Sequence, residues 1–451
     1  MYHSVPDPAR RNRSHGEGLA ENLRWGDGRP VRRVLMVAYF YPPAGGGGVQ
    51  RTLAFARHLP RSGWSPTVLC GTARGYWARD PGLAWDVSAE VLRVPDGPVL
   101  AAQRLVRRVL PRPARSVFDR AQIPDPQLGW ALPAVRAGAR RLARERHRVI
   151  YATGAPWTNM LVGALLARRF RLPLVADFRD PWADAPLRPP APALAPVHRA
   201  LERWVVSGAS WCLQTSPGYA AAMTAAYPDA QVLSLPNGFE EDDFDLELAP
   251  VPEPLPVGYA GSYYPGHGPE GLFRELAGLK AELSRDLRLW LYGNVGEAVP
   301  SEARLRVERF GYLPHRVVLQ RLAGCKAVFC TVPRVPGAEG CVPQKLYIYL
   351  RLNRPVLFWG PDGDAADILR RSGGRHLLLT EHGAERLGSD GDARPRGSGE
   401  ALASWLSGLR AEPDPRADND VRFVRSFERS EQTRRLAGIL DDAVRSAEPS
   451  P

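Results

Sequence analysis

Short runs of β-branched and aromatic residues alternate along this chain with segments of helical periodicity, and the whole alternation occurs twice. In the first half the runs lie at residues 34–39, 67–70, 91–94, 149–152, 174–178, 211–215 and 232–235, and in the second half at 257–260, 287–292, 327–331, 356–359 and 376–379. Strands that alternate with helices form parallel sheets covered by helices. The sequence therefore predicts two doubly wound α/β domains.

Composition along the chain suggests where these domains begin and end. The 451 residues allow two or three domains of ordinary size. Residues 1–30 are rich in Arg, Gly and Pro without an apolar stretch, which is typical of a disordered tail. We expect an N-terminal domain at 31–236, a Pro-rich linker at 237–256, a C-terminal domain at 257–415 and, at 416–451, a helix that packs back across both domains.

Several protein classes are disfavoured by simple features of the sequence. The longest strongly apolar run, at 160–167, is too short to cross a bilayer, because a spanning helix needs about 20 residues. The N-terminal residues do not resemble a secretory signal peptide. The 5 cysteines are an odd number without C-x-x-C spacing, which favours reduced thiols. A cytoplasmic protein is expected.

The chain is basic, with 60 Lys and Arg against 48 Asp and Glu. Arginines cluster at 104–120 and 136–148, in the expected N-terminal domain. Such clusters attract anionic lipid headgroups, phosphorylated ligands or nucleic acid, and the competing explanation is a general bias towards arginine. Because aromatic residues that could stack on bases are not interleaved with these arginines, nucleic acid is not expected. We expect an anionic or lipid-like ligand and peripheral attachment to an anionic inner membrane face.

Polar and glycine-rich segments follow most of the expected strands. They lie at 41–48, 153–156, 179–182, 215–218, 236–238, 261–264 and 360–363. In open α/β sheets, ligands bind beyond the carboxyl ends of the strands. Two sheets that face each other would therefore surround one cleft with these segments.

Four consecutive glycines, at 45–48, follow the first strand and open a helix. This arrangement lets backbone N–H groups approach a phosphate, and the alternative is a flexible turn. Nicotinamide binding is disfavoured, because the segment lacks the G-x-G-x-x-G spacing and the second strand ends at Cys70 and Gly71 without an acidic residue. The four glycines are therefore candidates for contact with an anion or a sugar.

Arg179 and Asp180 follow the strand at 174–178. Pro181 biases Asp180 away from helical geometry, which would present its carboxylate at the edge of the cleft. There Asp180 could contact a hydroxyl group of a bound ligand or act as its base. The competing interpretation is an Arg–Asp pair that ties two loops together.

Several motifs occur in a characteristic order. They are RVLMVAYFYPP at 33–43, GGVQRTLAFARHLP at 47–60, LVADFRDPW at 174–182, LPNGF at 235–239, GYAGS at 258–262 and VPQKLYIYL at 342–350. Together they resemble the glycosyltransferase family 4 proteins of the GT-B fold. The resemblance implies two Rossmann-like domains that face each other across a cleft, with the acceptor on the first and a nucleoside-diphosphate sugar on the second.

The same resemblance implies a retaining hexosyltransferase-type enzyme (EC 2.4), with a function such as polysaccharide biosynthesis. The acceptor would be a hydroxyl of a glycan, a lipid-linked molecule or a small molecule, and neither a metal nor a cofactor would be obligatory. Two D-x-D strings, at 243–245 and 362–364, lie in the linker and before a helix. Aspartate before a helix serves as a cap, so a metal is not expected.

By this resemblance Lys345 would neutralise the donor diphosphate, with Gly261 and Ser262 beneath it and Gly47 and Gly48 close by. The set of expected donor-binding residues is completed by Asn237, Glu339, Val342 and Gln344. Chemistry also favours Lys345, because a diphosphate that leaves without Mg²⁺ needs fixed cations and N–H dipoles. The competing interpretation of Lys345 is a solvated surface lysine.

The chain departs from the family at one position. Ile348 stands where the family usually has a Glu that binds both ribose hydroxyls, and the family's earlier Glu falls on Gly340, next to Glu339. A carboxylate–hydroxyl hydrogen bond contributes about 1.5–3 kcal/mol. Either Glu339 or another residue compensates, or donor binding is weakened. Two alternatives therefore stay open: a sugar-nucleotide epimerase of the same fold, and a non-catalytic binding subunit.

Overall fold

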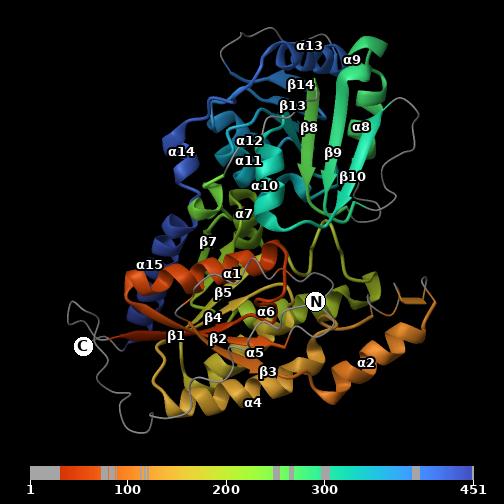
Figure 1. The fold of residues 1–451 in the computed structure, drawn as a ribbon. Coiled ribbons are helices and arrows are strands. Elements are labelled where there is room, and N and C mark those ends of the chain that lie inside the picture. The colour runs from red at the N-terminus through yellow and green to blue at the C-terminus, as the bar shows by residue number, and fades with distance from the viewer. Residues whose placement is uncertain are drawn as a thin grey trace, which may run out of the picture.

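The computed structural model describes residues 31–72, 80, 87, 89–111, 114–115, 118, 121–246, 254–263, 269–295, 305–388 and 397–448. The segment 1–30, which was expected to be a disordered tail, lies outside these residues. The described residues form two seven-stranded sheets, one in each half of the chain (Figure 1). The predicted α/β class, with two doubly wound domains, is confirmed.

The first sheet is entirely parallel and has the strand order β3-β2-β1-β4-β5-β6-β7. Its strands are β1 (Arg32–Val37), β2 (Trp64–Gly71), β3 (Glu90–Val94), β4 (Val149–Thr153), β5 (Leu174–Arg179), β6 (Trp211–Gln214) and β7 (Val232–Ser234). Each expected strand of the first half is present. The strand order reverses between β1 and β4, and in doubly wound sheets such a reversal opens a crevice for ligands.

The second sheet repeats the same topology, with the order β10-β9-β8-β11-β12-β13-β14. Its strands are β8 (Leu255–Ala260), β9 (Leu287–Tyr292), β10 (Arg306–Gly311), β11 (Ala327–Thr331), β12 (Val356–Trp359), β13 (Leu377–Thr380) and the antiparallel β14 (Gly383–Arg386). The sequence pattern did not predict β10 and β14. Both are edge strands with largely exposed or half-exposed residues, so neither carries a continuous apolar run.

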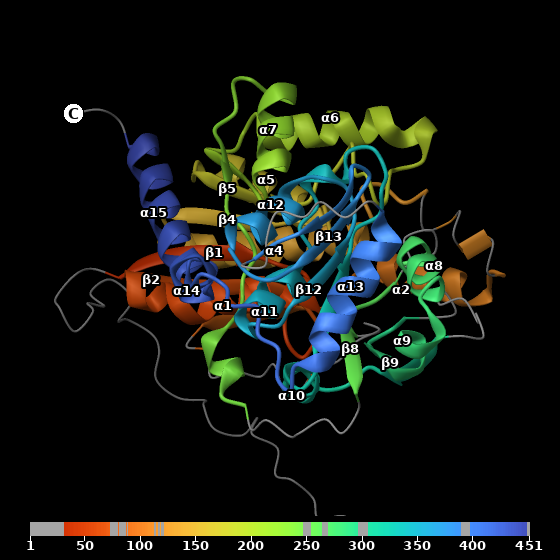
Figure 2. The ribbon, with the colours of Figure 1, turned by 90° about the horizontal axis from the view of Figure 1, so that it is seen from above.

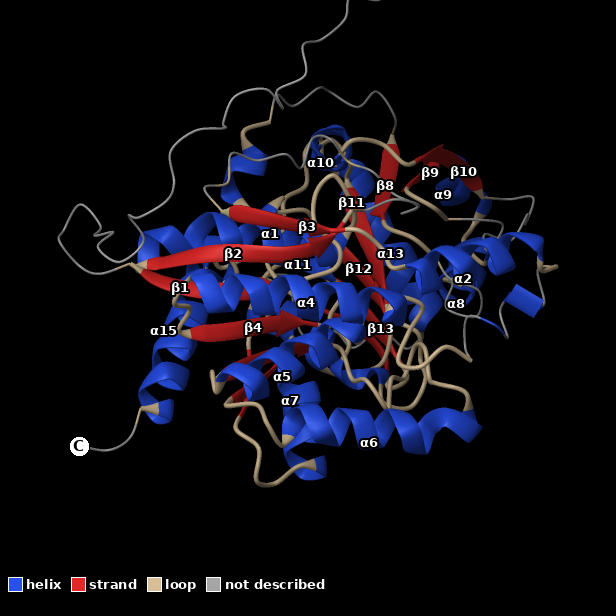
Figure 3. Cartoon of the chain, turned by 90° about the horizontal axis from the view of Figure 1, so that it is seen from below, coloured by secondary structure: helices blue, strands red, loops and turns tan. Residues whose placement is uncertain are grey.

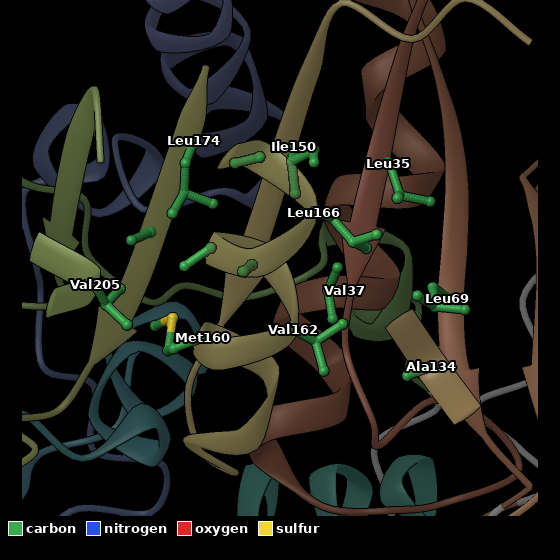
Figure 4. Close-up of a cluster of buried hydrophobic side chains, with 14 of the residues drawn as sticks. Leu35, Val37, Leu69, Ala134, Ile150, Met160, Val162, Leu166, Leu174 and Val205 are labelled. Atoms are coloured by element: carbon green, nitrogen blue, oxygen red, sulfur yellow. The ribbon is translucent and has the colours of Figure 1, made fainter. Parts of the chain in front are cut away.

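Helices cover both faces of the first sheet, because its central strands bury both sets of alternating side chains. The helices of this domain are α1 (Gly47–His58), α2 (Pro98–Val109), α4 (Leu128–Arg144), α5 (Thr158–Phe170), α6 (Ala195–Val206) and α7 (Pro217–Ala226). Helices α4 and α5 lie on one face of the sheet (Figure 3), where Leu35 and Val37 of β1 pack with them (Figure 4). Val34 and Met36 face the other way, towards α1. This alternation follows from the two-residue period of a strand.

The second sheet is sandwiched in the same way. Its helices are α8 (Glu270–Ala277), α9 (Ala281–Asp286), α10 (His315–Ala323), α11 (Gln344–Arg351), α12 (Asp364–Arg371) and α13 (Ser398–Ala411). Leu402 and Leu406 of α13 pack with α8 on one face. Leu346 and Leu350 of α11 pack with α12 on the other. The two domains therefore have separate cores.

The chain crosses between the domains twice. After β7 it enters the second domain, and at its C-terminal end it returns through α14 (Val421–Arg425) and α15 (Arg429–Ala447) (Figure 2). Helix α15 packs on the first domain, where Leu436 and Leu440 join the core beneath α1. The two crossing segments lie against each other, since Phe239 N donates to Phe427 O at 3.2 Å and Arg429 N donates to Phe239 O at 2.9 Å.

Replacement of Gly238 by Ala should destabilise the protein. A Cβ atom at this position would lie 1.8 Å from the carbonyl oxygen of Phe427, which belongs to the second crossing segment. We expect a loss of about 2–4 kcal/mol, because a backbone group cannot give way as a side chain can. Thermal unfolding measures it. The control is Gly408→Ala in α13, where a Cβ meets nothing within 4 Å and should stabilise the helix. An unchanged melting temperature for Gly238→Ala would show that this packing is dispensable.

Candidate functional site

The glycine-rich segment after β1 leads directly into α1, whose first residue is Gly47. Gly46 has a φ of 98°, a left-handed conformation that favours glycine. A Cβ at Gly48 would lie 2.6 Å from Nη1 of Arg179. The Arg179 guanidinium donates to Gly48 O at 3.1 Å and to Ala155 O at 2.8 Å. The structure therefore brings together two of the predicted site residues, Gly48 and Arg179.

A buried ion pair lies directly beneath this segment. Arg51 of α1 donates from Nε to Asp177 Oδ2 at 2.7 Å and from Nη2 to Oδ1 at 3.1 Å, and the side chains are 1% and 0% exposed. The hydroxyl of Tyr151 also donates to Asp177. Arg51 donates further to the carbonyl oxygens of Leu235 at 3.0 Å and Pro236 at 2.9 Å. One guanidinium thus joins α1, β5 and the start of the first crossing segment. No sequence motif had pointed to this pair.

Asn237, a predicted donor-binding residue, is held by the same guanidinium. Its side-chain oxygen accepts from Arg51 Nη1 at 3.3 Å. Asn237 therefore lies below the first turns of α1, close to the boundary between the domains.

Lys345 occupies the first turn of α11, opposite the end of β8. Its Nζ donates to the hydroxyl of Tyr259 and lies 3.7 Å from the centroid of that ring. A Cβ on Gly261 would lie 2.7 Å from Lys345 Nζ. Lys345, Gly261 and Ser262 are all half-buried. Lys345 and Gly261 are therefore immediate neighbours, and Lys345 does not extend freely into solvent.

Aromatic side chains fix the end of β8 beside Lys345. The Tyr259 ring stacks on Tyr263 at 4.6 Å and on Phe329 at 4.9 Å between centroids. The hydroxyl of Tyr349 on α11 accepts from Ala260 N at 2.9 Å. These contacts hold the Gly261 loop and the first turn of α11 in one arrangement. The family-like motif drew attention to Lys345, but it gave no signal for this aromatic support.

The two domains meet directly at the ends of their helices. Gln344 of α11 donates to Gln50 of α1. The Ser216 hydroxyl donates to Gly340 O at 2.6 Å, and Gly218 N donates to Asp364 Oδ2 at 2.7 Å. Asp364, part of a D-x-D string, thus interacts with the N-terminus of α7 in the other domain. Since Gln344 precedes Lys345, the first turns of α1 and α11 face each other across this interface.

Tyr219 packs into the same interface and meets the loop before α11. A Cβ on Gly340 would lie 2.4 Å from the Tyr219 ring. The phenol forms a hydrogen bond with the thiol of Cys341, and burial raises the pKa of that thiol to about 12. Asp180 raises this pKa further and Lys345 lowers it. The charges of these two candidate catalytic residues, one from each domain, thus act on the same thiol.

The carboxylate of Asp180 lies at the protein surface, where its side chain is exposed. The surrounding protein nevertheless raises the pKa of the carboxyl group, whereas the neighbouring Arg179 opposes that shift. Arg179 and Asp180 thus lie at the carboxyl edge of the first sheet, but the guanidinium of Arg179 binds the loops after β1 and β4 through its hydrogen bonds to Gly48 and Ala155.

The loop that carries Asp180 is anchored by buried groups behind it. Ala183 N donates to Glu202 Oε2 at 2.7 Å, and Trp182 Nε1 donates to His198 Nδ1 at 3.0 Å. The Trp182 ring stacks on Trp157 with 5.2 Å between centroids. Burial raises the pKa of Glu202 to about 7. None of these supports was identified in the sequence.

The remaining predicted residues lie around the first turn of α11. Glu339 is exposed, in a short 3-10 helix (Ala338–Gly340). The Val342 side chain is 7% exposed and packs in the core, so a ligand could reach only its backbone. Ile348 contributes to a small pocket at the domain boundary, which is also lined by Gln50, Gly238, Phe239, Glu240, Asp243, Phe244, His315 and Arg429. Ile348 therefore lies between the domains.

Basic residues from both domains surround the acidic run at the start of the expected linker. Glu240 is 5% exposed and lies 3.0 Å from His58 and 3.1 Å from Arg57, both on the first domain. On the second domain, Arg351 binds Glu241 through two hydrogen bonds. Asp243, from the other D-x-D string, lies 3.3 Å from His315. Within the described part of the chain, no group of three or more His, Cys, Asp or Glu side chains is arranged to hold a metal ion.

Comparison with known proteins identifies this architecture. Residues 46–238 match the family model described as the glycosyl transferase 4-like domain. A search of curated protein sequences gives no match.

Solved structures match over nearly the whole chain. HepE from Anabaena, in complex with UDP and glucose, has a TM-score of 0.57 at 17% identity, covering 91% of this chain and 100% of its own. Sucrose-phosphate synthase from Thermosynechococcus elongatus has a TM-score of 0.54 at 14% identity, covering 92% and 97%. The lipopolysaccharide outer core galactosyltransferase WaaB, in its apo form, has a TM-score of 0.53 at 13% identity, covering 92% and 99%.

The chain therefore has the GT-B fold, with two Rossmann-like domains of the same topology. Residues 46–238 match the glycosyl transferase 4-like domain, and the two-domain GT-B fold is the one that the sequence motifs predicted.

Removal of the buried guanidinium should be costly. Arg51→Met leaves the Asp177 carboxylate, which is 0% exposed, without its ionic partner. Breaking such a pair costs about 3–5 kcal/mol, to be measured by chemical unfolding. Arg199→Met is the matched control, since its pair with Asp184 is 50% and 71% exposed and should contribute about 0–1 kcal/mol. Equal stability losses in the two variants would contradict a central role for Arg51.

Glu202 should make stability depend on pH. With a folded pKa of about 7 against an ordinary 4.5, the folded state keeps a proton that the unfolded state loses. Stability should therefore fall as pH rises from 4.5 to about 7, by up to about 3 kcal/mol. Glu202→Gln should lose less stability than the parent protein between these two pH values, as followed by unfolding. Glu282→Gln, at a side chain 83% exposed, is the control. Parallel curves for Glu202→Gln and the parent would refute this shift.

Proposed function

We propose that this protein transfers a sugar from a nucleoside-diphosphate sugar to a hydroxyl group of an acceptor, with retention of the anomeric configuration. The observation that carries the proposal is the position of Lys345, beside Gly261 and in the first turn of the helix that contacts α1 through Gln344 and Gln50. An ammonium group between two helix N-termini suits a diphosphate. The complex of HepE with UDP and glucose supports the choice of donor class.

In this proposal the acceptor hydroxyl attacks the anomeric carbon from the face that the diphosphate leaves. The carbon–oxygen bond to the diphosphate breaks, its electron pair stays on the phosphate oxygen, and the proton of the acceptor hydroxyl passes to that oxygen. Lys345, the N–H groups of Gly47 and Gly48, and Ser262 stabilise the developing negative charge. Asp180 positions the acceptor hydroxyl from the first domain, and direct contact between the domains excludes water.

We further propose that Glu339 replaces the missing family carboxylate in binding the donor. Its side chain is exposed, and its backbone packs against Gly363 at the start of α12. Asn237, Gln344 and the Val342 backbone would complete the donor site. No metal or cofactor takes part in this proposal, in which diphosphate stabilisation rests on Lys345 and N–H groups.

The proposed setting is the cytoplasm, with the protein peripheral at the inner membrane face and engaged in glycan synthesis. Across the described residues, no helix is both long and apolar enough to traverse a bilayer. The acceptor would be a glycan, a lipid-linked molecule or a small molecule bound by the first domain, and nucleic acid is not a proposed partner.

Replacement of Lys345 by Ala should lower the rate of transfer by about 10²–10³, the usual effect of removing one transition-state donor. UDP, GDP and dTDP sugars are first screened by calorimetry and thermal shift. Transfer is then followed with the donor that binds. Lys280→Ala is the matched control, because Lys280 is an exposed lysine at the N-terminus of α9. Full activity in Lys345→Ala would refute the proposed role.

The same screen separates the two alternative functions. An epimerase would convert the donor without any acceptor, which product analysis of the donor alone detects. A non-catalytic binding subunit would show no stabilisation by any of the nucleotides.

A further inference from the structure

Exposed apolar side chains gather on helices α2 and α4 of the first domain. On α2, Leu105, Val106 and Val109 are 64%, 43% and 77% exposed. On α4, Leu128 and Leu132 are 43% and 58% exposed. Single exposed apolar residues are common, whereas a group of them on adjoining helices marks a contact surface.

The two helices adjoin where they begin. A Cβ on Gly97, just before α2, would lie 2.6 Å from the carbonyl oxygen of Gly129 on α4. Leu100 of α2 is 3% exposed and packs beside Gly129. The α2–α4 surface, defined as the exposed residues of these two helices, is therefore one continuous part of the first domain.

Arginines extend the apolar part of this surface along α4. Arg136, Arg140 and Arg144 are exposed and follow Leu128 and Leu132 at intervals of four residues, so the five side chains form one stripe that winds gradually around the helix. Neither α2 nor α4 contains an Asp or a Glu. Among the ion pairs of the described residues, none involves these three arginines. The stripe is apolar at one end and positively charged at the other.

We propose that the α2–α4 surface binds an anionic phospholipid bilayer, with Leu105 and Val109 in the interfacial layer and the α4 arginines on lipid phosphates. Apolar side chains beside arginines suit a headgroup layer, where each basic residue adds attraction. Nucleic acid would use the arginines but gain nothing from Leu105 and Val109, and the aromatic Trp130 of α4 is fully buried. A second copy would bring arginines against arginines.

If the proposed function holds, on which this step rests, the position of this surface gives it a role in acceptor delivery. Helix α2 begins at Pro98, shortly after β3 ends at Val94, so it starts at the carboxyl edge of the first sheet. The same edge carries Arg179 and Asp180. In Figures 1 and 3, α4 lies on the side of the first domain that faces away from the second domain, and α2 extends from it along the flank of the first domain. A bilayer bound there would lie beside the proposed acceptor site.

Vesicle flotation of the full chain tests this proposal without any sugar donor. Vesicles of phosphatidylcholine with phosphatidylglycerol should retain the protein, vesicles of phosphatidylcholine alone should not, and added salt should weaken the binding. The variants Leu105→Ser/Val109→Ser and Arg136→Glu/Arg140→Glu should each reduce partitioning by about tenfold or more.

Matched controls lie on α14, far from this surface. Val421→Ser replaces a side chain 64% exposed, and Arg422→Glu/Arg425→Glu reverses two exposed charges. Both should bind vesicles as the parent protein does, and thermal unfolding verifies that all variants are folded. Equal binding to both vesicle types, or undiminished binding of the α2 and α4 variants, would overturn the proposal. The proposal would also be overturned if the α2 and α4 variants abolished binding to duplex DNA, or self-association, but left vesicle binding intact.

Discussion

The buried pair of Arg51 and Asp177 is the contact on which the arrangement of the first domain depends. Removing a guanidinium and a carboxylate from water is unfavourable, and only a nearly complete set of hydrogen bonds compensates for it. Here those bonds come from β5, β4 and the segment after β7, so satisfying one charge fixes the distances among these elements. Because Arg51 lies one helical turn beyond Gly47 and Gly48, the same pair also sets where α1 begins.

The repeated topology explains why the candidate residues gather at one interface. In each sheet the strand order reverses beside the first strand of that domain, which is β1 or β8. The helices with the candidate phosphate contacts, α1 and α11, begin at the carboxyl edge next to this reversal. Gln50 and Gln344 then bring the two helix N-termini face to face. Their positive ends would repel each other without an anion between them. A negatively charged ligand would therefore stabilise this arrangement, which is consistent with the GT-B fold of the chain and with the proposed diphosphate donor.

Much of the fold was predictable from sequence because buried parallel strands appear as uninterrupted apolar runs. The edge strands β10 and β14 were missed, since strands with exposed faces carry no such run. The order of the sequence motifs was enough to predict that Lys345 and Gly261 lie close together. The contact between Arg179 and Gly48 depends on a left-handed backbone at Arg179, with a φ of 62°, which no sequence motif indicates. The packing of Tyr219 against Gly340 arises only once the domains are placed together.

The paired crossing segments also limit how the domains can separate. Two strands of chain held side by side by the Phe239 hydrogen bonds form a short ribbon, which bends readily across its flat face but resists sliding and twisting. The second domain can therefore swing about a single pivot next to Gly238. Near the pivot, Arg51 and Asn237 keep their spacing through such a swing. Farther out, such a swing must break the hydrogen bonds of Gln344 with Gln50 and of Gly218 with Asp364, so these contacts set how readily the interface opens.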